Sequence, residues 1–325
     1  MKIKGIGLFS GGLDSILAVK VIAGLGIEVT GVAFETPFFD ARKSRTMAEK
    51  IGLPLIVMDI TDDHRIMLEA PRYGYGRNMN PCIDCHMLML KKAGEKMEEM
   101  GADFLFTGEV LGQRPMSQGK QSLHIVASRS GYGGYVLRPL SARLLPETIP
   151  EKEGKVDRKK LLDIQGRSRK RQIEMARNYG ISGYSSPAGG CLLTDPIFSR
   201  RLKDLFEHRK DHDVRDIELL KHGRHLRLNQ AVKVIVGRKE GENNAIEDLS
   251  RNGDVIIKVR DYPGPTTLVP YGCDDEVLKL ASSICVLYSD APNDSEVMVL
   301  CGKGDTSWLI SAVSASKEEV KNLMI

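Results

Sequence analysis

The sequence predicts an α/β protein, in which a doubly wound parallel sheet is followed by a smaller α+β domain. Over residues 3–137, short apolar runs alternate with longer periodic runs, and this alternation is typical of parallel sheets covered by helices. A glycine turn joins the first apolar run to the first periodic run. After Asp195 the alternation is lost. We therefore place one domain at residues 1–195 and a second at residues 196–325.

Apolar runs define the elements of the first domain in order. They predict strands at Ile3–Phe9, Glu28–Phe34, Leu53–Ile60, Phe104–Thr107 and Tyr135–Leu137. Periodic runs predict helices at Leu13–Leu25, Asp40–Ile51 and Ile83–Met100. Ligands of such sheets bind beyond the carboxyl ends of the strands. Ala33 and Phe34, at the end of the second strand, are therefore expected beside the glycine turn, where they could line an adenine pocket.

The stretch from Glu151 to Arg177 is rich in charge. Apolar residues are interspersed among the charges, so we predict helix with a basic outer face. The basic residues of interest are Arg167, Arg169, Lys170 and Arg171. This face is either simply solvated or follows the phosphate backbone of an RNA beside the active site.

The second domain mixes helices with consecutive strands. Helices are predicted at Ile197–Arg209, Glu240–Arg251, Asp274–Leu287 and from Lys317 onward. Strands are predicted at Ala231–Val236, Asp254–Val259, Thr267–Val269, Glu296–Leu300 and Trp308–Ile310. The segment at residues 222–226, which includes Arg224, is basic. It forms either an RNA-facing surface or an ordinary sheet edge.

Composition describes an ordinary globular protein. The 325 residues are 42% hydrophobic and 28% charged, with a net charge of +4 that permits an RNA partner without requiring one. No apolar run approaches the length of a membrane span. The N-terminus runs directly into the first strand and leaves no room for a signal peptide. We therefore expect a cytoplasmic protein with no membrane partner.

The glycine turn has the composition of an anion site. Its sequence is Ser10, Gly11, Gly12, Leu13, Asp14 and Ser15. Backbone N–H groups at the start of the following helix can bind phosphate, and the two glycines allow a close approach. The serine hydroxyls add donors, and Asp14 can hold Mg²⁺. The turn lacks the lysine of a Walker A loop. The alternative is a strand-to-helix turn that binds nothing.

A second glycine-punctuated loop, residues 107–118, follows the fourth strand. By topology it faces the same crevice as the glycine turn, which makes Gly108 and Gln113 candidate nucleotide contacts. Arg114 could neutralise phosphate or contact RNA, and Glu109 could bind Mg²⁺, or both could be solvated.

Two cysteines mark the start of the long helix. Cys82 and Cys85 are three residues apart, so their thiols share one side of the helix, and the helix dipole favours their thiolates. Alternatives are a c-type haem attachment, a thioredoxin-like pair, half a zinc site, two incidental thiols, and two sulfur ligands of an iron–sulfur cluster or persulfide relay. Cys191 lies in another loop of small residues and could be a third thiol. Cys285 and Cys301 have the surroundings of buried small hydrophobes.

These motifs together resemble the tRNA thiolation branch of the PP-loop ATP pyrophosphatases. Residues 10–15 match the PP-loop, whose enzymes split ATP between the α and β phosphorus and adenylate an oxygen. Residues 107–118 are similar to a segment of tRNA 4-thiouridine synthetases. Residues 80–85 and 189–191 are similar to the two cysteine segments of tRNA 2-thiouridylases. Residues 222–267 resemble the RNA-binding domain of the NFACT ribosome-associated factors.

The resemblance implies cofactors and a reaction. Iron–sulfur-dependent members hold a [4Fe–4S] cluster with three thiolates, here Cys82, Cys85 and Cys191, and the remaining iron carries sulfide. The implied reaction is uridine thiolation in tRNA with ATP and Mg²⁺, and Asp14 and the three cysteines are its catalytic residues. The sulfur donor is sulfide or a persulfide carrier, and the chain could form a homodimer.

Two features leave the product and function open. The chain lacks the N-terminal extension and rhodanese tail typical of 4-thiouridine synthetases, and no C-terminal barrel of the 2-thiouridylase kind is evident. The product is therefore 4-thiouridine or 2-thiouridine. Alternatives are a PP-loop amidotransferase or ligase acting on a small molecule, and an RNA-binding protein with a regulatory ATP site.

Overall fold

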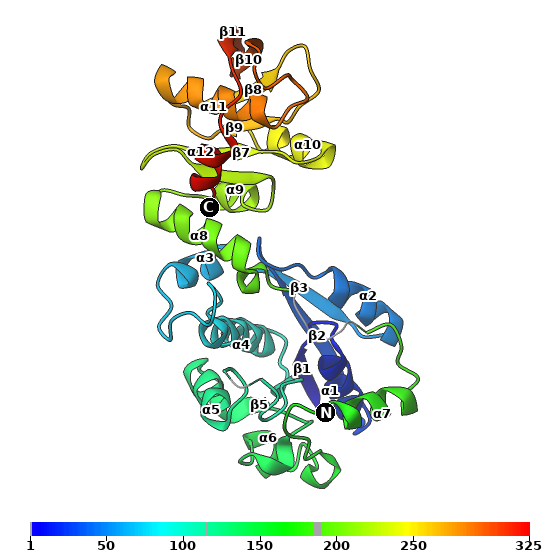
Figure 1. The fold of residues 1–325 in the computed structure, drawn as a ribbon. Helices are drawn as coiled ribbons and strands as arrows, with labels where there is room; N and C mark the ends of the chain where they lie inside the picture. The colour runs from blue at the N-terminus through cyan, green and yellow to red at the C-terminus, as the bar shows by residue number, and fades with distance from the viewer. Residues whose placement is uncertain (1, 115, 185–189) are drawn as a thin grey trace. The chain divides into compact units, whose positions relative to one another are not determined.

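The computed structural model describes residues 2–114, 116–184 and 190–325. The chain divides into two compact units, Met1–Thr194 and Asp195–Ile325 (Figure 1). Among the helices of these described ranges, none is both long and apolar enough to cross a membrane.

A five-stranded parallel sheet forms the centre of the first unit. Its strands are β1 (Lys4–Leu8), β2 (Glu28–Glu35), β3 (Leu55–Asp59), β4 (Phe104–Thr107) and β5 (Val136–Leu137). They lie in the order β3-β2-β1-β4-β5, and Ile6 of β1 is in register with Thr30 of β2 and Leu105 of β4. The predicted doubly wound α/β class is therefore confirmed.

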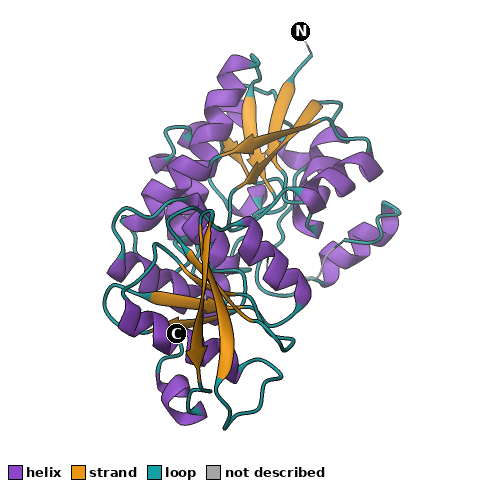
Figure 2. Cartoon of the chain, turned by 90° about the horizontal axis from the view of Figure 1, so that it is seen from above, coloured by secondary structure: helices purple, strands orange, loops and turns teal. Residues whose placement is uncertain are grey.

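Helices cover both faces of this sheet (Figure 2). They are α1 (Leu13–Ala23), α2 (Arg42–Ile51), α3 (Thr61–Glu69), α4 (Cys82–Glu99), α5 (Lys120–Arg129), α6 (Ile149–Lys152) and α7 (Lys170–Asn178), with short 3₁₀ turns at Gly133–Tyr135, Ala142–Leu144, Arg158–Lys160 and Leu192–Thr194. Buried residues of α1, α2 and α7 form one apolar cluster, and those of α4 and α5 form another. No element was predicted for α3 or α5.

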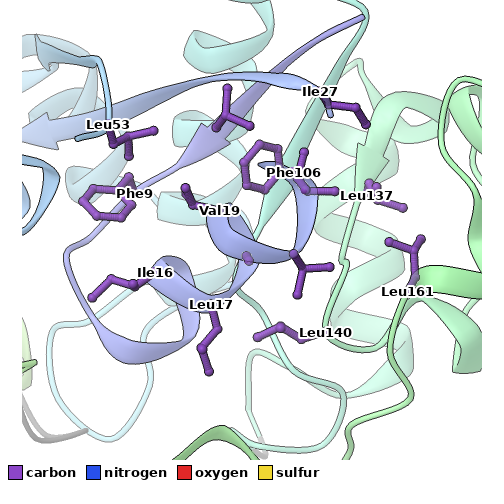
Figure 3. Close-up of a cluster of buried hydrophobic side chains, with 14 of the residues drawn as sticks. Phe9, Ile16, Leu17, Val19, Ile27, Leu53, Phe106, Leu137, Leu140 and Leu161 are labelled. Carbon is purple, nitrogen blue, oxygen red and sulfur yellow. The ribbon is translucent and has the colours of Figure 1, made fainter. Parts of the chain in front are cut away.

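The first cluster is drawn in Figure 3, where Phe9, Ile16, Val19 and Phe106 face one another beneath the sheet. Leu161 from the charged stretch joins the same cluster. Burying large apolar side chains on both faces of a parallel sheet stabilises it, because each fully buried side chain contributes about 1.5–3 kcal/mol. This packing fixes the strand ends at which the glycine turn lies.

The charged stretch is not the continuous helix that was predicted. It contains α6, a 3₁₀ turn and α7, separated by turns, bends and irregular chain. Leu161 and Ile164 are buried in the core of the unit, and the Ile164 N–H donates to the carbonyl of Leu140 at 2.8 Å. Gly154 and Gly166 have φ of +72° and +81°, in the left-handed region. Tertiary burial of the apolar residues and these glycine turns override the helical periodicity.

The second unit is built on a six-stranded antiparallel sheet. Its strands are β6 (Arg224–Arg227), β7 (Lys233–Val236), β8 (Val255–Val259), β9 (Thr267–Val269), β10 (Val297–Lys303) and β11 (Thr306–Ala312), in the order β11-β10-β8-β9-β7-β6. Its helices are α8 (Pro196–His208), α9 (Val214–Leu219), α10 (Glu240–Asp248), α11 (Asp275–Leu287) and α12 (Lys317–Asn322). Apolar residues of α11 and α12 pack on the strands, and so do those of α9 and α10 in a separate cluster. Cys285 and Cys301 are buried in this core, as predicted.

Candidate active site

The glycine turn connects β1 to α1. The Ser15 hydroxyl donates to the Gly12 carbonyl at 2.8 Å, and the Gly12 N–H lies 3.4 Å from the Ser10 hydroxyl. Gly12 is the N-cap of α1 and has no side chain with which to cap it. The first N–H groups of a helix have no intrahelical acceptor, so this end of α1 can bind an anion.

Two glycines let neighbouring backbone pack against the turn. A Cβ on Gly11, whose φ is +69°, would lie 2.6 Å from the Lys43 carbonyl oxygen. A Cβ on Gly108, after β4, would lie 2.5 Å from the Ser15 nitrogen. The missing side chain of Gly11 therefore lets the Lys43 backbone pack against the turn, and that of Gly108 lets the second loop pack directly against the turn.

Two glutamine side chains, linked by a hydrogen bond, hold the Asp14 carboxylate. Gln113 donates through Nε2 to Asp14 Oδ2 at 2.8 Å, and Gln172 of α7 donates to Gln113 Oε1 at 3.0 Å. An Arg169 guanidinium nitrogen lies 3.9 Å from Asp14 Oδ2. The other carboxylate oxygen, Asp14 Oδ1, is buried and has no hydrogen-bond partner among the described residues. An unsatisfied carboxylate oxygen of this kind is a suitable ligand for Mg²⁺.

A cavity of about 670 Å³ opens beside the turn. Its lining residues come from the whole length of the first unit, from Leu8 to Thr194. They include most of the predicted nucleotide contacts: Ser10, Gly12, Asp14, Ser15, Ala33, Phe34, Gly108 and Gln113. Gly11 is the one predicted nucleotide contact that does not line the cavity, because it packs against the Lys43 backbone. A partly apolar cavity with a few polar groups is typical of a small-molecule site.

The same cavity is lined by Cys82, Cys85 and Cys191, which are all free and none fully exposed. Asp84 accepts hydrogen bonds from the Arg72 and Tyr73 N–H groups at 3.0 Å, which pins the preceding loop to the first turn of α4. The structure therefore brings all three cysteines to the cavity that holds the glycine turn. Gly190 also lines the cavity, whereas residues 185–189 before it lie outside the described residues.

The Cys85 and Cys191 thiols are not poised as thiolates, and for Cys85 this is contrary to the expectation from the helix dipole. Burial raises the pKa of the Cys85 thiol far above its usual range, and the neighbouring thiols of Cys191 and Cys82 add to this effect. Burial likewise raises the pKa of Cys191 to about 11. Desolvation outweighs the dipole at Cys85 because the side chain is enclosed by protein.

A buried histidine, which no sequence pattern singled out, adjoins this thiol. His64 is fully buried between the rings of Phe38 and Phe39, and its Nε2 lies 3.5 Å from Cys85 Sγ. Burial lowers the pKa of His64 to about 4, so its ring is neutral. Only tertiary packing places this residue, because α3 lies far from the cysteines along the chain.

Glu109 lines the cavity but its carboxylate is engaged. It accepts from Arg138 Nε at 2.9 Å and from the Thr107 hydroxyl at 3.1 Å, and lies 3.2 Å from His86 Nδ1. Although burial alone would raise its pKa, the charges of Arg138 and His86 lower the pKa of Glu109 to about 2. Glu109 is thus held by protein partners on both oxygens, which leaves Asp14 as the better Mg²⁺ ligand.

The basic residues predicted to contact RNA lie in different places. Arg114, Arg167 and Arg169 line the cavity. Arg171 is exposed and donates to Asp163 at 2.9 Å, and Lys170 is also exposed. Arg224, in the second unit, places its guanidinium 4.5 Å from the ring centre of Tyr288.

The thiols are chemically suited to a soft metal, yet they do not form a ready metal site. Within the described ranges, no three His, Cys, Asp or Glu side chains gather closely enough to hold a metal ion. Three cysteines on one cavity wall nevertheless supply the donor type that iron–sulfur clusters require.

Two family models match separate parts of the chain. Residues 1–143 match the family described as thiamine biosynthesis protein (ThiI). Residues 223–324 match the NFACT protein RNA binding domain. The residues between these two matches, 144–222, include Arg169, Gln172 and Cys191 of the cavity region.

Similar proteins are tRNA-modifying enzymes. The tRNA-specific 2-thiouridylase MnmA of Symbiobacterium thermophilum is 29% identical over 164 residues, covering 43% of this chain and 42% of that protein. MnmA of Kocuria rhizophila is 30% identical over 159 residues, with coverages of 43% and 42%. A solved 4-thiouridine synthetase–RNA complex with bound ATP is 26% identical, covers 42% of this chain and 36% of its own, and has a TM-score of 0.34.

The chain spans less than half the length of these curated relatives. The family models nevertheless match where the motifs predicted them, over residues 1–143 and 223–324. The chain is therefore similar to the PP-loop proteins of tRNA thiolation in its first part and to the NFACT RNA-binding domain in its second.

Proposed function

We propose that this protein is an ATP-dependent tRNA sulfurtransferase that replaces a uridine carbonyl oxygen with sulfur. The observation that carries the proposal is one cavity of about 670 Å³ lined by both the PP-loop and three cysteines. A nucleotide site beside three free thiols is what adenylation followed by sulfur transfer requires. The tRNA partner is supported by the match of residues 223–324 to an RNA-binding domain and by the similarity of the first part of the chain to tRNA-specific 2-thiouridylases.

The first step is adenylation. In this proposal ATP binds with its phosphates at the start of α1 and its adenine toward Ala33 and Phe34, which both line the cavity. The uridine carbonyl oxygen attacks the α-phosphorus, an O–P bond forms, and the bond to the β-phosphate oxygen breaks with release of pyrophosphate. The ring N–H proton is lost in this step. Asp14 would hold Mg²⁺, which when bound neutralises phosphate charge. The protein mainly positions the reactants.

The second step is displacement of AMP by sulfur. A sulfide equivalent at the cysteine end of the cavity attacks the activated ring carbon, forming a C–S bond as the C–O bond to AMP breaks. Cys82, Cys85 and Cys191 would hold the sulfur source. As ligands of a [4Fe–4S] cluster they would support a sulfide that attacks directly. With a persulfide, the outer sulfur would form the C–S bond, a second of the three thiols would break the S–S bond to the product, and an external thiol would reduce the resulting disulfide. A bound cluster would supply an open iron for sulfide. Iron and acid-labile sulfide assayed on anaerobically purified protein distinguish these forms.

Two variants separate the steps. Asp14→Asn should reduce tRNA-dependent AMP release at least about 1000-fold, because it removes the anionic Mg²⁺ ligand. Cys191→Ser should leave AMP release near the wild-type rate and stop incorporation of labelled sulfide into tRNA. Wild-type AMP release from Asp14→Asn, or normal labelling by Cys191→Ser, would contradict the assignment.

The host phenotype identifies the product. Mass spectrometry of nucleosides from total tRNA, with and without this gene, should show the loss of one thiolated uridine. The identity of the lost nucleoside decides between 4-thiouridine and 2-thiouridine. If every thionucleoside persists, a PP-loop ligase acting on a small molecule becomes the better explanation.

A further inference from the structure

We propose that Arg169 is the cation that binds the β,γ-phosphates of ATP in this protein. The inference rests on the ATP site of the proposed function and adds a residue to it. Arg169 lies in the part of the chain that neither family model covers. Its sequence surroundings, a run of exposed basic residues before α7, had suggested contact with RNA instead.

The position of Arg169 is the first reason. Its guanidinium lies 3.9 Å from Asp14 Oδ2, directly at the PP-loop, and its side chain is 15% exposed. Lys43, Arg114 and Arg167 are the other Lys or Arg residues among the described lining residues, and all three are exposed. Arg169 is therefore the cation that the protein encloses beside the phosphate site.

An unused hydrogen-bond donor is the second reason. Arg169 Nε is buried and has no hydrogen-bond partner among the residues that the structure describes. Buried donors are normally satisfied, and an orphaned one points to a missing ligand. Oδ1, the other oxygen of the Asp14 carboxylate, is also buried and unpaired. Both residues line the cavity, so a phosphate and its cation bound there would supply the missing partners.

The chemistry of the turn is the third reason. The PP-loop contains no lysine, so the loop itself offers a tetra-anionic nucleotide only backbone N–H groups and two hydroxyls. An arginine binds phosphate through several donors with fixed geometry. When the uridine oxygen attacks the α-phosphorus, negative charge grows on the departing pyrophosphate, and Arg169 stabilises that charge. Gln113, which accepts a hydrogen bond from Gln172, donates to the same Asp14 oxygen that Arg169 faces.

Binding of nucleotide fragments to the full chain tests this assignment. Calorimetric titrations with ATP, pyrophosphate and AMP would compare wild type, Arg169→Gln and the matched control Arg171→Gln, whose arginine is paired with Asp163 on the surface. We expect Arg169→Gln to weaken ATP and pyrophosphate about 10- to 100-fold, the loss of one charge-assisted interaction. AMP affinity should change less than about twofold, and Arg171→Gln should match wild type.

A chemical measurement on the wild type avoids any folding defect of the variant. Phenylglyoxal modifies accessible arginines, and mass spectrometry locates the products. ATP and pyrophosphate should protect Arg169 while AMP does not, and Arg171 should react equally throughout. Equal modification of Arg169 with and without ATP would overturn the proposal.

RNA binding provides the opposing outcome. If Arg169 belongs to an RNA surface, Arg169→Gln will reduce tRNA affinity in gel shifts and leave ATP affinity unchanged, which contradicts the assignment. If the wild-type chain binds no ATP, the proposed function itself fails together with this inference. If wild type binds ATP and Arg169→Gln binds it equally well, only the role of Arg169 is refuted.

Discussion

Two carboxylates, the half-buried Asp14 of the first unit and the buried Asp254 of the second, face arginine side chains in different ways. Asp254 of the second unit accepts from Arg215, from the Arg251 N–H at 2.9 Å and from the Tyr271 N–H at 2.8 Å. Both of its oxygens are therefore satisfied. Asp14 of the first unit accepts from Gln113 through one oxygen, and its other oxygen is buried without a partner.

The difference separates a structural pair from a binding site. A buried ion pair with all its hydrogen bonds made adds little net stability, but removing one partner is strongly destabilising because the other charge stays buried without a partner. A buried polar atom left open costs stability, and proteins keep such atoms where a ligand completes them. Similar chemistry thus holds the second unit together and leaves the first unit ready to bind.

The largest expected effect comes from making the same substitution at both sites. Asp254→Asn should lower the unfolding free energy by about 3 kcal/mol, because Arg215 loses one of its two buried carboxylate partners. Asp14→Asn should change it by less than about 1 kcal/mol while it abolishes AMP release. Trp308, in β11, is the only tryptophan of the chain, so its fluorescence during urea unfolding reports on the second unit.

The comparison would fail if Asp14→Asn destabilised its own unit as much as Asp254→Asn does. Far-UV circular dichroism reports on both units, so a dichroism transition that the Trp308 fluorescence does not share belongs to the first unit, which lacks tryptophan.

Substitution of two glycines tests whether the turn is kept open for a ligand or is constrained by packing. A Cβ on Gly108 meets the PP-loop backbone at 2.5 Å, whereas a Cβ on Gly12 comes no closer than 3.4 Å, to the Ser10 hydroxyl. Gly108→Ala should therefore lower stability by about 1–3 kcal/mol and also weaken ATP binding. Gly12→Ala should weaken ATP binding alone. Thermal melts and ATP titrations measure both effects.

Gly253→Ala is the control, because its Cβ would meet nothing within 4 Å. Equal stability losses for Gly12→Ala and Gly108→Ala would show that the turn is constrained by its own packing and not kept open for a ligand.

The smallest expected effect is a pH dependence of the second unit. His225 is fully buried, and burial, together with the nearby charges of Lys233 and Arg201, holds its pKa well below 6.5. Between that value and about 6.5, the unfolded chain binds a proton that the folded chain does not. Stability should therefore fall as pH drops from 7.5 to 5, by at most about 1.4 kcal/mol per pH unit.

The variant His225→Leu should flatten this slope in fluorescence-monitored unfolding. His222→Gln is the matched control, since His222 is only half-buried and its pKa is lowered less completely by burial. An unchanged slope in His225→Leu would assign the pH dependence to other groups.

Much of the fold could be predicted from the sequence because its signals are local. The turn at residues 10–15 and the five apolar runs each depend only on residues adjacent in the sequence, and the structure has a strand at each apolar run. The charged stretch after Glu151 was predicted wrongly as helix, since its periodicity contains no information about the core that Leu161 and Ile164 join. The open carboxylate, by contrast, depends on Arg169 and Gln113, whose proximity no local pattern reveals.

The sequence by itself determined the class of the first unit, the anion-binding turn and three thiols that could act together. These follow from residue type and short spacing, which set backbone conformation and chemical capacity. Only the tertiary structure decided that the thiols share a cavity with the turn, that burial keeps Cys85 protonated, and that Arg169 faces Asp14. Proximity between distant residues and desolvation arise from packing of the whole unit, and neither is encoded in any single stretch of sequence.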